Sequence, residues 1–159
     1  MPPFYELAVA AFAQSSTKHK WAIAVVFTPS SGHSLVYQIA GSAADYSLEA
    51  PQSVTLKEGD NGYLGRAPIG LVDSEKLHQL HTTIASIPII RGNPSWTSHN
   101  WVMEGIAALR RIQEIHVDQH VSIQWISDRL GIQRKCGNDG SVLGCPEDWS
   151  DVSPSRENE

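Results

Sequence analysis

The sequence is poor in sulfur, in basic residues and in long apolar runs. It holds two cysteines and two methionines among 159 residues, and 12 basic residues against 17 acidic ones. No apolar run approaches the roughly 20 residues that a membrane-spanning helix needs. The start of the sequence, residues 1–6, lacks the basic segment of a secretory signal. We therefore expect no membrane span, and a soluble, cytoplasmic protein.

Negative charge is concentrated near the end of the sequence. The formal net charge is −5, and residues 147–159 hold five acids against one arginine, so the rest of the chain is nearly neutral. Binding to phosphate groups needs a basic stripe, and none is visible. Arg110-Arg111 and Arg134-Lys135 are short pairs typical of solvated helix ends. Nucleic acid is therefore not expected as a partner.

Neither the cysteines nor the histidines form a recognisable metal site. Cys136 and Cys145 lie in a Gly-rich stretch. Two free thiols in a reducing compartment fit this pattern, and so does a disulfide that closes a short loop, because the glycines let the chain turn back. His78 and His81 are three residues apart but have no third ligand nearby. We expect no metal and no cofactor.

The residue pattern predicts a single α+β domain over residues 1–131. With 41% hydrophobic and 18% charged residues, the chain can bury an ordinary core. Apolar and β-branched runs in the first half predict an antiparallel sheet of four to five strands. These predicted strands are residues 5–13, 21–27, 33–40, 52–57 and 62–72.

Helical periodicity dominates the second half and predicts about three helices that pack on the sheet. Asp73 is a good N-cap for the first helix, and Pro88 ends it. The second helix starts near Ser98, and the third covers residues 118–130. Residues 132–159 are rich in Gly, Ser, Pro and acid and predict an extended or poorly ordered tail.

The first predicted strand bears on the oligomeric state. Residues 5–9 form an apolar run that we place at an edge of the sheet. An apolar edge strand can pair with a second copy of the same chain. This placement would allow a homodimer.

Two short segments combine reactive side chains with tryptophan. Residues 19–23 read His-Lys-Trp-Ala-Ile at the start of a predicted strand, and residues 98–102 read Ser-His-Asn-Trp-Val at the start of a predicted helix. Unpaired backbone N–H groups and the positive end of the helix dipole stabilise negative charge at a helix start. A nucleophile or a base can therefore be activated there.

The two segments resemble the motifs of a permuted papain-like fold, found in acyltransferases and hydrolases related to lecithin retinol acyltransferase. In that family a His-Trp-Ala strand supplies the base, and an Asn-Cys-Glu-His-Phe-Val helix start supplies the nucleophile. Lys20 stands where this histidine would fall, and Ser98 where the cysteine would fall. The helix motif is also similar to the Asn-Cys-x-x-Trp-Val motif of a group of uncharacterised fungal proteins. Over residues 5–130, the resemblance implies a sheet packed on helices, with a cleft between Lys20 and Ser98.

The favoured hypothesis is an enzyme that has kept this cleft and changed its chemistry. It would transform a small organic molecule by acid/base isomerisation, cyclisation or hydrolysis, with His99, Lys20 or His19 as acid or base. An imidazole at the helix start would have its pKa lowered by the dipole, which leaves a neutral base near pH 7. The residues predicted to bind the substrate are His19, Trp21, Asn100 and Trp101.

Two alternatives remain open. One is a noncatalytic module that binds a ligand or a protein through the same cleft. The other is an acyl hydrolase with Ser98 as nucleophile and Lys20 as base, which requires a lysine desolvated enough to lose its proton. Thr97 or Ser98 could also serve simply as the N-cap of the helix. The site hypotheses predict that the Lys20 and Ser98 side chains come within about 8 Å of one another.

Overall fold

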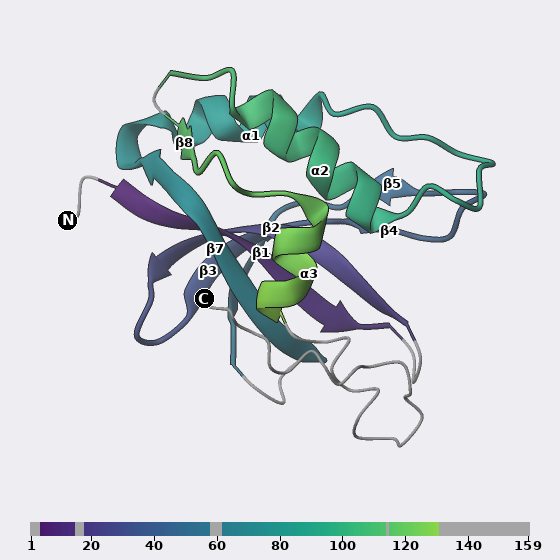
Figure 1. Ribbon diagram of the computed structural model, residues 1–159, viewed down its shortest axis with the longest axis horizontal. Coiled ribbons are helices and arrows are strands. Elements are labelled where there is room, and N and C mark those ends of the chain that lie inside the picture. Colours follow the sequence, from purple (N-terminus) through teal and green to yellow (C-terminus); the bar gives the residue numbers. More distant parts are fainter. Residues whose placement is uncertain (1–3, 15–17, 58–61, 114, 131–159) are drawn as a thin grey trace.

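The computed structural model describes residues 4–14, 18–57, 62–113 and 115–130, which form an α+β fold (Figure 1). Its main element is a six-stranded antiparallel sheet with the strand order β6-β3-β2-β1-β7-β8. The strands of this sheet are β1 Phe4–Ala13, β2 His19–Thr28, β3 His33–Tyr37, β6 Gln52–Thr55, β7 Tyr63–Asp73 and β8 Ile115–Val117. A separate pair joins β4 Ile39–Ala40 to β5 Ser47–Leu48. The helices are the 3-10 helix η1 Ser74–Lys76 and the α-helices α1 Leu77–Ala85, α2 Ser98–Leu109 and α3 Ile123–Leu130.

The α+β class follows the sequence prediction, with a sheet built mainly from the first half and helices from the second. The sheet has one strand more than the four to five predicted, because the short edge strand β8 follows α2. Three residues are too few to give a clear period-two pattern. The predicted strand 33–40 is interrupted at Gln38, where β3 has ended and β4 has not begun.

The third helix begins later than predicted. It starts at Ile123, and the Ser122 Oγ accepts a hydrogen bond from the Trp125 backbone N–H at 3.1 Å, as an N-cap does. The predicted start at residue 118 was wrong, because β8 and a turn occupy residues 115–121. Cys136, Cys145 and the tail at 132–159 lie outside the described residues.

Strand β1 lies inside the sheet and not at its edge. Leu7 pairs with Val25 of β2 on one side and with Gly70 of β7 on the other. The prediction of an edge strand at residues 5–9 was therefore wrong, and the edges among the described strands are β6 and β8. The apolar character of β1 reflects burial on both faces. A homodimer stays a prediction, but the pairing of residues 5–9 as an edge strand no longer supports it.

Alternation along the strands gives the sheet two different buried faces. One face, here called the helix side, carries large side chains such as Leu7, Trp21 and Ile23. The other, the alanine side, carries a separate cluster built on small side chains. This cluster consists of Ala8, Ala10, Ala22, Ala24, Val26, Val36 and Leu56. Successive strand residues point to opposite faces. His19 therefore lies on the helix side with Trp21, and Lys20 lies on the alanine side with Ala22.

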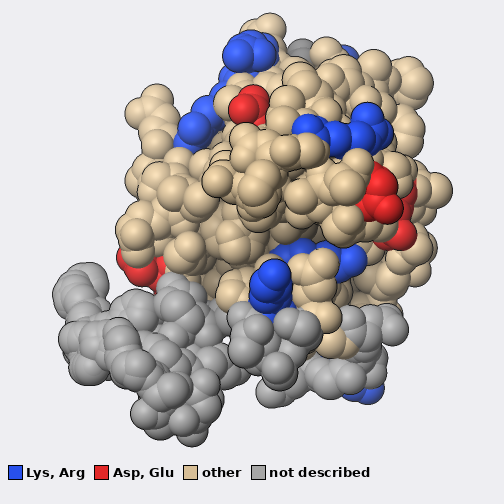
Figure 2. Space-filling view, turned by 90° about the vertical axis from the view of Figure 1, so that its right-hand side faces the viewer, with Lys and Arg blue, Asp and Glu red and all other residues tan. Residues whose placement is uncertain are grey.

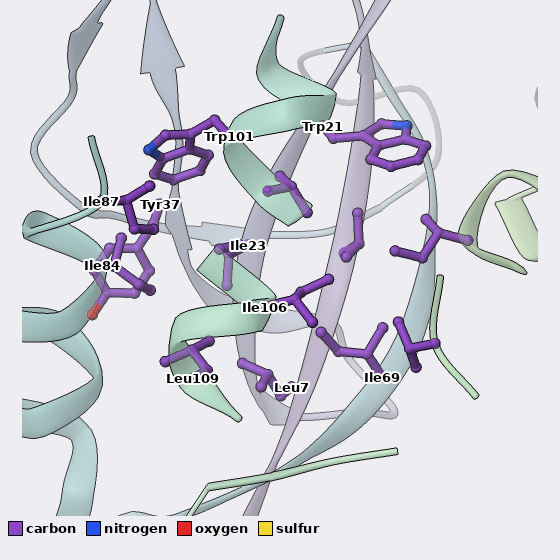
Figure 3. Packing of buried hydrophobic residues seen from close by; sticks show 14 of the residues in the cluster. Leu7, Trp21, Ile23, Tyr37, Ile69, Ile84, Ile87, Trp101, Ile106 and Leu109 are labelled. Carbon is purple, nitrogen blue, oxygen red and sulfur yellow. The ribbon is translucent and has the colours of Figure 1, made fainter. Parts of the chain in front are cut away.

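Helices α1 and α2 lie side by side over the helix side of the sheet (Figure 1). Gly105 lets α2 come close, because a Cβ atom there would lie 2.8 Å from the Cδ1 atoms of Ile23 and Ile87. Figure 3 shows Trp101 beside Ile87, with Ile106 further along the same helix. Burying each such large apolar side chain contributes about 1.5–3 kcal/mol. This packing holds the first turn of α2 against the start of β2.

Candidate functional site

The first turn of α2 meets β2 at the place where β3 separates from it. Pairing between β2 and β3 ends at Ile23 and Tyr37, after which the chain continues as β4 and pairs with β5. Trp21 therefore has no β3 partner, and its backbone N–H donates a buried hydrogen bond to the Ser98 Oγ at 3.1 Å. These two residues are 77 positions apart in the chain. Ser98 thus replaces the acceptor that a longer β3 would have supplied.

A cavity of about 590 Å³, here called the helix-side cavity, opens beside this contact. Its walls come from the chain just after β1, from the start of β2, from β4 with the loop after it, and from the first turn of α2 with the loop before it. The lining residues are Gln14, Lys18, His19, Lys20, Ile39, Ala40, Gly41, Ser42, Ala43, Tyr46, Pro94, Thr97, Ser98 and His99. This volume lies within the range of about 300–1,000 Å³ typical of small-molecule sites.

Four of the residues singled out in the sequence line this cavity: His19, Lys20, Ser98 and His99. Lys20 stands at its border, because Lys20 also lines a second cavity on the alanine side. Strand alternation gives His19, and not Lys20, the same direction as Trp21. Sequence reasoning could have found this preference, because a buried Trp21 fixes which of its neighbours shares its face.

The other predicted substrate-binding residues do not belong to the lining of the helix-side cavity. Trp21 and Trp101 are 1% and 0% exposed and belong to the core. Asn100 completes the N-terminal cap of α2, where its Oδ1 accepts a hydrogen bond from the Thr97 backbone N–H at 2.8 Å. Asn100 borders a different groove, on the outer side of α2. The geometry therefore gives these three residues structural tasks.

Thr97 and Ser98 divide the structural work at the helix start. Thr97 is the N-cap, and its Oγ1 accepts a hydrogen bond from the His99 backbone N–H at 3.2 Å. Ser98 is 7% exposed, and its oxygen is occupied by the Trp21 N–H. Ser98 therefore connects α2 to β2 through this hydrogen bond, and only a small part of its surface faces the cavity.

The two histidines of the cavity are close neighbours. The His99 ring stacks on the Trp21 indole, with ring centroids 4.1 Å apart and an angle of 25° between the planes. The His19 and His99 ring centroids are 5.6 Å apart. The His99 Nε2 is buried and has no hydrogen-bond partner. His19 is half-buried, so it is the more accessible imidazole of the pair.

Both imidazoles are neutral at pH 7. Burial, together with the nearby His19, lowers the pKa of His99 to about 4, although a hydrogen bond with the His19 backbone acts in the opposite direction. Burial also lowers the pKa of His19 from its ordinary value of 6.5. The sequence predicts this direction from the helix dipole, whereas the main cause is desolvation. A neutral imidazole offers one donor and one acceptor nitrogen.

The charges around the cavity favour an anionic ligand. Lys18 and Lys20 belong to its lining, and none of the described lining residues is acidic. Figure 2 looks on to the side of the molecule where α2 begins and the β4–β5 pair lies. Lys and Arg side chains border the uncharged middle of this face above and below, and Asp and Glu side chains lie farther out, at its right edge, above it and at the lower left. A cavity with this lining attracts a carboxylate or a similar anion.

Part of the wall consists of residues outside the two motif segments that the sequence did not single out. Among them are Lys18, Ala40 of β4, Ser42, Ala43 and Pro94. Within the part of the chain that the structure describes, no group of three His, Cys, Asp or Glu side chains is arranged to hold a metal ion. None of the described helices has both the length and the apolar character required to cross a bilayer.

Comparison with protein-family models, with curated proteins and with solved structures gives no match.

Proposed function

We propose that the helix-side cavity binds a small organic molecule and that the chain is an acid/base enzyme, with His19 as the proton-transferring group. The observation that carries this proposal is the pair of neutral imidazoles, with ring centroids 5.6 Å apart, in the lining of a cavity of about 590 Å³. An imidazole that is unprotonated at pH 7 can accept a proton from a bound molecule and return it. Acid/base-catalysed isomerisation and cyclisation proceed through such a transfer.

His19 and His99 have different parts in this proposal. His19 is half-buried and meets the ligand, whereas the enclosed Nε2 of His99 does not. His99 is a positioning residue: its hydrogen bond with the His19 backbone and its stacking on Trp21 hold the start of β2 in place. A protonated His99 would repel a proton from His19, so a neutral His99 leaves His19 free to act as a base.

The lysines would stabilise charge that develops during the reaction. Removing a proton from carbon next to a carbonyl group leaves an enolate, and a nearby cation lowers its energy. Lys18 and Lys20 are the cations in the described lining. We infer that the substrate is a small carboxylic or keto acid, which the same positive charges would attract.

The papain-like scaffold remains part of the proposal. The hydrogen bond between the Trp21 N–H and the Ser98 Oγ supports it, because it joins the two motif segments at a strand start and a helix start. The same bond argues against Ser98 as a nucleophile, since it holds the side chain in a buried position, 7% exposed, and draws electron density from the oxygen. Strand alternation also places Lys20 on the alanine side, which argues against Lys20 as the base for Ser98. Labelling of Ser98 by a fluorophosphonate would contradict this interpretation and favour the acyl hydrolase.

One observation favours a second candidate function, a noncatalytic ligand-binding module. The Ser98 oxygen already accepts a hydrogen bond from the Trp21 N–H, and the His99 Nε2 is buried, so His19 is the more accessible of the two imidazoles in the described lining. A cavity of this kind could bind an anion without transforming it. Catalysed exchange of substrate protons with solvent is expected of the enzyme and not of the binding module.

The proposal is tested by proton exchange into heavy water. A panel of small keto and carboxylic acids is incubated with the protein, and loss of the proton signal next to the carbonyl group is followed by NMR. We expect catalysed exchange for at least one acid, with a rate reduced at least about 100-fold in His19→Gln, as removal of a general base does. His78→Gln, at an exposed position on α1, is the matched control and keeps the full rate.

The outcomes distinguish the two functions. Binding of an acid without exchange favours the binding module. Exchange that survives His19→Gln contradicts the role of His19. If no acid of the panel binds in the helix-side cavity, both candidate functions lose their ligand class.

A further inference from the structure

A second cavity, of about 250 Å³, lies on the alanine side of the sheet and is here called the alanine-side cavity. Its walls come from β1, β2, β3, β6 and the start of β7. The lining residues are Phe12, Ala13, Lys20, Val36, Gln38, Gln52, Val54, Thr55, Leu56 and Tyr63. It opens near the same separation of β3 from β2 that produces the helix-side cavity. Lys20 is the residue common to both linings.

Gln38 places an unused acceptor in this wall. Its Oε1 is buried and has no hydrogen-bond partner. Its backbone oxygen accepts a hydrogen bond from the Glu49 N–H at 2.9 Å, which holds the residue in position between β3 and β4. A buried acceptor without a donor costs about 1–3 kcal/mol. A rotation of the Gln38 amide that turns Oε1 toward the cavity would let a ligand with an N–H or O–H group remove this cost by donating to it.

The remaining lining sets the charge and the shape of such a ligand. Lys20 is the charged residue among the described lining residues, so the cavity favours an anion. The Phe12 and Tyr63 rings, with centroids 5.9 Å apart and planes at 57°, form an aromatic wall. The volume is below the range of about 300–1,000 Å³ typical of sites for drug-sized ligands. One ring with small substituents fits this space.

We propose that the alanine-side cavity is a second small-molecule site, for a single-ring organic acid that also carries an N–H or O–H donor. The carboxylate meets Lys20, the donor meets the Gln38 Oε1, and the ring packs beside Phe12 and Tyr63. This site lies on the opposite face of the sheet from the proposed enzyme site, and the two linings share Lys20. It does not depend on the function proposed for the helix-side cavity.

The ligand class is tested with four related probes. The meta and para isomers of hydroxybenzoate carry both required groups, benzoate lacks the donor, and para-hydroxybenzamide lacks the charge. Binding is followed by amide NMR on the full chain. We expect at least one hydroxybenzoate to bind about tenfold more tightly than benzoate, which corresponds to about 1.4 kcal/mol. Amides of β3, β6 and the start of β7 should shift.

Substitutions then test the residues. Gln38→Leu keeps the side-chain size and removes the acceptor, so hydroxybenzoate should bind it no better than benzoate. Gln79→Leu, at an exposed position on α1, is the matched control and should bind like the unchanged protein. Val54→Trp fills the alanine-side cavity and should abolish hydroxybenzoate binding. Ala43→Trp narrows the helix-side cavity and should leave hydroxybenzoate binding unchanged.

Three results would overturn the proposal. The first is that neither hydroxybenzoate binds at millimolar concentration. The second is that Gln38→Leu, with a native NMR spectrum, keeps the preference for hydroxybenzoate over benzoate. The third is that Ala43→Trp abolishes binding and Val54→Trp does not, which would assign the ligand to the helix-side cavity.

Discussion

The helix side and the alanine side of the sheet are buried by different means. On the helix side, Trp21 and Ile23 pack against Trp101 and Ile106 of α2, so large side chains meet large side chains. On the alanine side, short side chains along β1 and β2 leave little to remove and, away from the alanine-side cavity, little room to add. The two faces therefore respond in opposite ways to a change of side-chain volume.

Both faces nevertheless have a cavity in the same region. The cause is the end of the β2–β3 pairing at Ile23 and Tyr37, after which β4 turns away to pair with β5. A strand that leaves its neighbour uncovers both faces of the sheet at once. Polar side chains can then line a cavity on either face: His19 on the helix side and Gln38 on the alanine side.

The largest effect is expected from truncation on the helix side. Trp101→Ala should lower the free energy of unfolding by about 3–5 kcal/mol, because it leaves a cavity beneath α2. Urea unfolding followed by circular dichroism measures this change. Ile90→Ala, at a position that is 40% exposed, is the control and should cost less than about 1 kcal/mol. Equal losses for both variants would remove the distinction between core and surface here.

Enlargement should be the damaging change on the alanine side. Ala24 is fully buried and pairs with Ala8 and Val36, so Ala24→Leu should lower the free energy of unfolding by about 1–3 kcal/mol through overpacking. Ala107→Leu, at an exposed position on α2, provides the matched control and should be nearly neutral. The same urea experiment serves. An Ala24→Leu variant as stable as the unchanged protein would mean that this face has spare room.

The tie between the two motif segments can be removed without a large change in volume. Ser98→Ala leaves the buried Trp21 N–H without an acceptor and should cost about 1–3 kcal/mol of unfolding free energy. Hydrogen exchange of the Trp21 amide should accelerate together with this loss. Ser95→Ala, at an exposed position in the loop before α2, should change neither quantity. Unchanged protection of the Trp21 amide in Ser98→Ala would show that the bond contributes nothing.

The smallest effect is a dependence of stability on pH that arises on the helix side. The pKa of His99 is lowered to about 4 in the folded protein, against an ordinary value of 6.5. Between these pH values the unfolded chain binds more protons than the folded protein at His99. The stability contributed by the neutral His99 is therefore fully present above pH 6.5 and is lost as the pH falls toward 4. The loss contributed by His99 should reach at most about 1.4 kcal/mol per pH unit.

Urea unfolding at pH 7, 6 and 5 measures this slope. Burial lowers the pKa of His19 as well, so His19 adds to the loss in the same direction. His99→Gln should flatten the dependence, whereas His78→Gln, exposed on α1, should retain it. A slope that persists in His99→Gln would mean that other groups cause it.

Sequence patterns predicted much of the local structure. Apolar and β-branched runs indicated the strands that became β1, β2 and β7, and Asp73 marks the start of η1, where its side chain accepts a hydrogen bond from the Glu75 N–H. The place of β1 within the sheet was predicted wrongly. An apolar run such as residues 5–9 shows that a strand is buried, but it does not show which strands lie on either side of it.

The candidate site divides in the same way. The motif segments indicated that His19, Lys20, Ser98 and His99 would lie near one another, and these residues line one cavity. Their individual tasks could not be predicted as well. The Ser98 oxygen accepts from the Trp21 N–H only because β3 ends early, and no residue near Ser98 in the chain records where β3 ends.

The sequence by itself determined the α+β class, the two-sided character of the central strands and the reactive residues available. These features depend on neighbours along the chain, since strand and helix periodicity are local. Only the tertiary structure decided the strand order, the separation of β3 from β2 and the burial that lowers the pKa of His99. Those features arise from contacts between residues far apart in the chain, because each cavity is closed by several elements at once.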